Sequence, residues 1–144
     1  MFTKVLEKPL FKEFILLSLS VAVLHAVATH FDLYWTTDYS DILMHFLGGA
    51  MVSVAFLWFY FYSGLFSSPN RNISLYFLIA ILGTVLVSVS WEIFELLMDA
   101  ERVGDIGYAS DTTLDFIMDL VGALVASFYS YYSSSHSHQN HEIY

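Results

Sequence analysis

The stretch 42–66, ILMHFLGGAMVSVAFLWFYFYSGLF, decides the fold class of this chain. It contains no Asp, Glu, Lys or Arg, and it is longer than the roughly 20 apolar residues that cross a hydrocarbon core of about 30 Å. A helix of a soluble bundle would need a polar outer face, and residues 46–66 offer almost none. The stretch therefore predicts a membrane-spanning helix.

Three more apolar stretches of similar length occupy residues about 13–31, 73–98 and 112–132. The composition agrees, because 57% of the residues are hydrophobic and 13% charged, whereas soluble domains carry about 25% charged residues. We expect an all-α, polytopic membrane protein, a four-transmembrane-helix bundle in residues 1–132 with a disordered polar tail at 133–144. The first stretch also fits a signal peptide, but we expect an uncleaved helix.

The positive charges predict the orientation of the bundle. Lys4, Lys8 and Lys12 precede the first helix and Arg71 lies between the second and third, so all four fall on one side of the membrane. Arg102 falls on the other side. Positive residues gather in cytoplasmic loops, so we expect both termini to be cytoplasmic and the protein to lie in a cell membrane.

Composition also narrows the function classes. The chain has only five Lys and Arg residues, which argues against a nucleic-acid partner. It has no Cys, which excludes disulfides, thiol catalysis and thiolate metal sites. No glycine-rich phosphate loop is present, so no organic cofactor is indicated.

The acidic residues gather on one side of the predicted bundle. Apart from Glu7, Glu13 and Glu142 near the chain ends, every Asp and Glu falls in the outer half of a helix or in an outer loop. Helical spacing places several of them on shared faces, since residues three or four apart lie above one another. The residues expected to converge as metal ligands are His45, Glu92, Glu95, Asp115 and Asp119, and those expected to line the same pocket are Asp41 and Asp111.

Depth sets these acids apart from loop charges. With a rise of 1.5 Å per residue, Asp115 lies about 6 Å and Asp119 about 12 Å inside a helix that enters the membrane at Asp111, for which we expect a capping role. A carboxylate at the bilayer centre costs about 2.5–3.5 kcal/mol on insertion scales. Such groups need a partner: a divalent ion such as Mg, Mn, Ca or Zn, a shared proton, or a cationic or hydroxyl-rich ligand.

Three short motifs carry a family resemblance: DILMHFLGG at 41–49, WEIFELLMD at 91–99 and DTTLDFIMDLVGALVA at 111–126. They resemble the YjdF-like family, small bacterial membrane proteins of unknown function, and the broader VanZ-like group. The resemblance implies a bacterial inner membrane, a cell-envelope setting and a lipid or glycan-carrier ligand. It also implies functional roles for Asp41, His45, Glu92, Glu95, Asp111, Asp115 and Asp119.

Three functions remain open, with the first slightly favoured. The first is a non-catalytic binding or accessory protein with a membrane-protein partner or a second copy of itself. The second is a metal-dependent membrane enzyme acting on a lipid or glycan-carrier headgroup, and the third is a proton- or cation-coupled transporter. The transporter is disfavoured because the inner halves of the middle helices offer only Ser53, Ser74 and Thr84. Ser88 is assigned to close helix packing, and His25 to the core.

Overall fold

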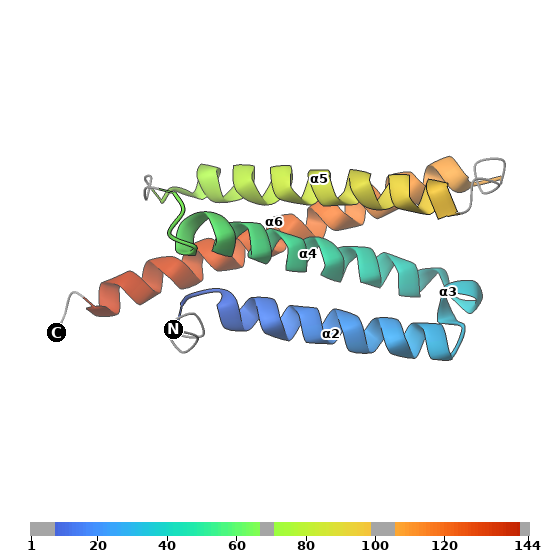
Figure 1. Ribbon diagram of the computed structural model, residues 1–144, viewed down its shortest axis with the longest axis horizontal. Helices are drawn as coiled ribbons and strands as arrows, with labels where there is room; N and C mark the ends of the chain where they lie inside the picture. The colour runs from blue at the N-terminus through green and yellow to red at the C-terminus, as the bar shows by residue number, and fades with distance from the viewer. Residues whose placement is uncertain (1–7, 67–70, 99–105, 142–144) are drawn as a thin grey trace.

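The computed structural model describes residues 8–66, 71–98 and 106–141, and all its regular elements are helices. The elements are α2 (Phe11–His30), α3 (Leu33–Thr36), α4 (Asp38–Tyr62), α5 (Ile73–Met98) and α6 (Tyr108–His141) (Figure 1). The four long helices are each long and apolar enough to cross a membrane. The prediction of an all-α bundle with four membrane-spanning helices is confirmed.

The helix bounds differ from the predicted ones mainly at polar ends. The third predicted helix coincides with α5, whereas α4 begins at Asp38 and α6 continues to His141, beyond the predicted end at 132. Hydropathy marks only the part of a helix that contacts hydrocarbon, and backbone hydrogen bonding continues past it. In α6 the continuation is anchored, because buried Ser134 accepts a hydrogen bond from the Tyr62 hydroxyl at 2.8 Å.

α4 lies at the centre of the bundle. It contacts α2, α5 and α6, and α5 also contacts α6 (Figure 1). Within the described residues the backbone of α2 comes close only to α3 and α4, and it reaches α6 through side chains such as that of Glu13, which accepts a hydrogen bond from Tyr129. It therefore stands to one side of the α4–α5–α6 unit. The start of α2 and the end of α6 lie at the same end of the bundle (Figure 1).

Glycines permit the closest helix approaches. A Cβ added at Gly49 would collide with the backbone of Asp119, and one added at Gly122 would collide with the backbone of Phe46 and Ala50. Small residues at a crossing let two helix backbones touch, which favours association inside a bilayer. The crossing of α4 and α6 at Gly49 and Gly122 fixes the positions of the side chains one turn away.

The outer surface is apolar, as expected for helices that face lipid. Leu16 on α2 is 64% exposed and Leu82 on α5 is 61% exposed, and large exposed hydrophobic residues cover both helices. A soluble bundle would bury such residues. Lys4, Asp99, Glu101, Arg102 and Asp105 lie outside the described residues, so the orientation of the termini stays a prediction.

Candidate metal centre between α4 and α6

Two acidic turns meet at the close crossing of α4 and α6. Asp41 and His45 occupy the two turns of α4 before Gly49, and Asp115 and Asp119 occupy the first half of α6 before Gly122. The helices are parallel neighbours, since α5 runs back between them in the chain order, and their backbones touch at the glycines (Figure 1). The crossing therefore brings both pairs into one layer of the bundle.

His45 is the centre of this layer. Its Nε2 lies 3.9 Å from Oδ1 of Asp41 and 3.7 Å from Oδ1 of Asp115, and its Nδ1 lies 3.4 Å from Oδ1 of Asp119. One ligand atom from each of Asp41, His45 and Asp115 falls within 4.8 Å of the others. The structure thus brings four of the seven predicted site residues together, with three carboxylates around the imidazole ring of His45.

Ser88 joins the cluster from α5, a role that the sequence analysis missed by assigning Ser88 to packing. Its hydroxyl donates a hydrogen bond to Oδ2 of Asp119 at 2.5 Å, and both residues are buried. The sequence did contain a sign of this role: Ser88 precedes Glu92 by four residues, which places both on the same helical face.

Glu92 borders the cluster and is deeply buried, with 8% of its surface exposed. Its carboxyl group interacts with the Thr112 hydroxyl and lies within electrostatic range of His45 and Asp119. Its Oε2 has no hydrogen-bond partner within the described part of the chain. A buried carboxylate oxygen without a partner is costly, so this atom points to a ligand or a proton in the layer.

Glu95 and Asp111 lie at the edge of the layer. Oε1 of Glu95 accepts a hydrogen bond at 3.0 Å from the indole Nε1 of Trp91 on the same helix. Asp111 is exposed in the first turn of α6, and the prediction that it caps this helix is wrong. The helix starts one turn earlier because Gly107, at φ 105°, turns the chain and its carbonyl accepts the amide N–H groups of Ser110 and Asp111.

A comparison with protein-family models matches residues 2–136 to the predicted membrane proteins called DUF2238. The chain belongs to this family. Neither the comparison with curated proteins nor that with solved structures gave a match. Membership of DUF2238 and the four apolar helices together establish a multi-pass membrane protein in contact with the lipid bilayer. The family is compatible with the YjdF-like resemblance, and the VanZ-like one is not shown.

A short polar link ties α2 and α3 together beside the cluster of this DUF2238 protein. Nδ1 of His25 lies 2.8 Å from the Tyr34 hydroxyl, and His25 is exposed rather than in the core as predicted. It is exposed because α2 packs on the bundle through only one side. Burial, and secondarily the charge of Asp41, raises the pKa of Tyr34 above 10, so its hydroxyl stays protonated at neutral pH.

The opposite half of the DUF2238 bundle is more polar than the sequence analysis expected. Three buried serines of α6 continue the face of Asp119 towards the other end of the helix: Ser127, Ser130 and Ser134. We call these residues, with Ser53 and Thr84, the hydroxyl stripe. Most bond within the chain, since Ser53 donates to the Ala123 carbonyl at 3.2 Å and Ser127 to the Leu124 carbonyl at 2.9 Å.

Proposed function

We propose that this DUF2238 protein binds a divalent cation between α4 and α6, with Asp41, His45 Nε2 and Asp115 as the protein ligands. One observation carries the proposal above all: these three side chains come from two helices and present ligand atoms within 4.8 Å of one another. Two ligands that each lie about 2.1 Å from a tetrahedral ion are about 3.4 Å apart. The 3.7 and 3.9 Å separations at Nε2 exceed this spacing by about 0.3 and 0.5 Å, and the two carboxylate oxygens, which lie within 4.8 Å of each other, exceed it by about 1.4 Å at most.

The ligand set selects among the candidate ions. One imidazole and two carboxylates suit Zn²⁺ or Mn²⁺ better than Mg²⁺ or Ca²⁺, which take mainly oxygen ligands. Three protein ligands leave a coordination position for a water or for an external oxygen. In a membrane, the phosphate or hydroxyl oxygen of a lipid headgroup is the ligand class that we propose for this position.

In this proposal Asp119 acts through His45 rather than on the ion. It lies beside Nδ1, the ring nitrogen that faces away from the ligand group, at 3.4 Å. A carboxylate on the second nitrogen orients a metal-bound histidine and raises its basicity. The Ser88 hydroxyl holds Asp119 in turn.

Glu92 supplies the negative charge next to the open position. Its buried Oε2 is available to accept a hydrogen bond from a bound water or hydroxyl group, which would satisfy the atom. Binding is favoured over catalysis, because we find no activated nucleophile beside this acid among the residues that the structure describes. A metal-activated water assisted by Glu92 is the enzymatic alternative.

Elemental analysis of the detergent-purified protein tests the site. We expect about one zinc or manganese ion per chain in the wild type and a loss of at least 10-fold in Asp115→Asn. The matched control is Asp32→Asn, the same chemical change at an exposed residue with φ 53°, a conformation that Asn tolerates. A wild type without metal after growth in zinc and manganese, or an Asp115→Asn variant that keeps it, would contradict the proposal.

The hydroxyl stripe favours a second candidate function, the movement of a proton or cation through the bundle. Ser130 is fully buried and its Oγ has no partner within the described residues, which leaves it available to a water molecule. Vesicles that enclose a pH-sensitive dye test this candidate under an imposed pH gradient. A leak that requires Asp119 and Ser130 would support it, and a leak equal to that of protein-free vesicles would eliminate it.

A further inference from the structure

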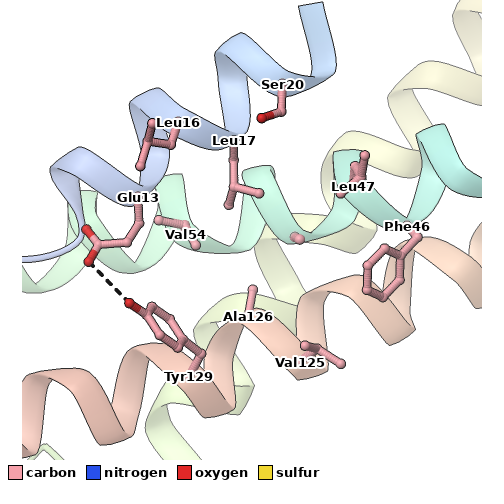
Figure 2. Close-up of a pocket in the computed structure, with 11 residues that line it drawn as sticks. Glu13, Leu16, Leu17, Ser20, Phe46, Leu47, Val54, Val125, Ala126 and Tyr129 are labelled. Carbon is pink, nitrogen blue, oxygen red and sulfur yellow. Dashed lines mark hydrogen bonds between the residues drawn. The ribbon is translucent and has the colours of Figure 1, made fainter. Parts of the chain in front are cut away.

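A groove runs along the bundle outside the acidic layer, between α2 and α6 with α4 as its floor (Figure 2). It encloses about 420 Å³, within the range of small-molecule sites. The floor is lined by Phe46, Leu47, Ala50 and Val54 of α4. The groove exists because α2 contacts α4 but stands away from α6 within the described residues.

The walls are almost entirely apolar. α2 contributes Leu16 and Leu17, and α6 contributes Val125 and Ala126 (Figure 2). All three bounding helices are long and apolar enough to span a membrane, so the groove opens sideways into hydrocarbon. An apolar groove at that depth stays dry and loses dispersion contacts unless hydrocarbon fills it.

The size of the groove discriminates between a helix and a single hydrocarbon chain. Its floor runs from Phe46 to Val54, about 12 Å of helix rise. A helix about 10 Å wide takes up about 900 Å³ over this length, and the empty space of about 880 Å³ includes the open side of the groove, so a helix would lie partly outside the walls. An extended acyl chain is far narrower than a helix, and it fits.

One end of the groove carries a charge. Glu13 lines the groove at the start of α2, and its Oε1 accepts a hydrogen bond from the Tyr129 hydroxyl at 3.5 Å (Figure 2). Lys12, the preceding residue, is exposed. A carboxylate at a membrane surface gains from a cationic partner, and an adjacent lysine suits a phosphate. Glu13 at the end of the groove matches the ammonium group of a zwitterionic headgroup, and the exposed Lys12 next to it in the sequence is available to a phosphate.

We propose that the groove binds a phospholipid with a primary ammonium headgroup, with one acyl chain along α4 between α2 and α6. The ammonium group pairs with Glu13 and the phosphate with Lys12. The site is separate from the proposed metal centre, which lies on the α6 and α5 side of α4. Loss of one does not require loss of the other.

Lipid retention tests the proposal. The protein is reconstituted into vesicles of equal phosphatidylethanolamine and phosphatidylglycerol, re-extracted in mild detergent, and its bound lipid is identified by mass spectrometry. We expect about one phosphatidylethanolamine per chain, enriched at least fivefold over phosphatidylglycerol. Retention of the two lipids in the bulk ratio would overturn the proposal.

Variants locate the lipid. Ala50→Leu fills the floor, and Val125→Phe narrows the wall at a half-exposed residue without straining the core, so each should lower retention at least fivefold. Glu13→Gln keeps the acceptor for Tyr129 and should abolish only the headgroup preference. Leu82→Phe, on the lipid-facing surface of α5, is the control and should retain lipid as the wild type does.

A second copy of the chain is the competing occupant. The chain has no cysteine, so Leu17→Cys introduces a single thiol into the groove wall. Under oxidation in the bilayer this variant should remain monomeric. A disulfide-linked dimer, or unchanged lipid retention in both Ala50→Leu and Val125→Phe, would overturn the lipid assignment.

Discussion

The two halves of the bundle are built from the same three helices, α4, α5 and α6, but their buried polar groups differ in kind. In the half with His45 and Asp115, carboxylates crowd one layer, and Oε2 of Glu92 is left without a partner within the described residues. In the half with the hydroxyl stripe, Ser53 and Ser127 bond neighbouring carbonyls, and the buried atoms without a partner there, such as Oγ of Ser130, are uncharged. A hydroxyl that donates a hydrogen bond to a backbone carbonyl needs no role beyond helix packing. A buried carboxylate oxygen without a hydrogen-bond partner requires a ligand or a proton.

The largest effect should come from breaking the crossing that both halves share. In Gly49→Val the new side chain would collide with the backbone of Asp119, and we expect a loss of more than about 3 kcal/mol or a failure to accumulate. A thermal-challenge assay by size-exclusion chromatography measures it. Gly48→Ala is the control, because a Cβ there meets nothing within 4 Å. Equal thermal stability of the two variants would show that the crossing is looser than described.

A smaller, local effect should separate the two halves. Asp119→Asn keeps the shape of the side chain but weakens its hold on His45, so we expect metal affinity to fall about 10–100-fold. Titration against a chelator measures the affinity. Ser127→Ala, on the same helix in the other half, should leave it unchanged. If the two variants bind metal with the same affinity, Asp119 does not orient His45 as a metal ligand.

The hydroxyl half has its own sensitive position at Tyr62. The Tyr62 hydroxyl donates to Ser134 at 2.8 Å and accepts from Arg71 at 3.2 Å, so Tyr62→Phe should cost about 1–2 kcal/mol. Hydrogen exchange should become faster in the last turns of α6 and stay unchanged around Asp115. Faster exchange at both ends of α6 would mean that the two halves unfold as one unit.

The smallest effect should distinguish a satisfied hydroxyl from an unsatisfied one. Ser53→Ala removes a buried hydrogen bond to the Ala123 carbonyl and should cost about 1 kcal/mol. Ser130→Ala removes a hydroxyl that has no partner within the described residues, and its unfolding free energy should stay within about 0.5 kcal/mol of the wild type. A larger loss for Ser130→Ala would reveal a bound water and would favour the transport candidate.

Much of the fold could be predicted because transmembrane helices are recognised from the length and hydropathy of apolar stretches. The bounds of α5 agree with the apolar stretch, since its limits coincide with changes in polarity. The polar end of α6 was not predicted, because contacts such as that of Ser134 with Tyr62 depend on another helix. The short helix α3 carries no periodic signal of its own.

The candidate site was predictable in part. The spacing of Asp41 with His45, and of Asp115 with Asp119, places each pair on one helical face, and the structure brings the two pairs together. Spacing gave no way to tell which ring nitrogen faces which carboxylate, because that depends on the rotation of two helices about their axes.

The sequence by itself predicted four membrane-spanning helices and a group of acids in their outer halves, because hydropathy and helical periodicity are local properties. Only the tertiary structure decided which of these acids meet. The Gly49 and Gly122 crossing sets the helix separation and rotation, so His45 faces Asp115 and Asp119 while Glu95 bonds Trp91. The groove beneath α2 arises in the same way, from a separation between helices that no single stretch of sequence encodes.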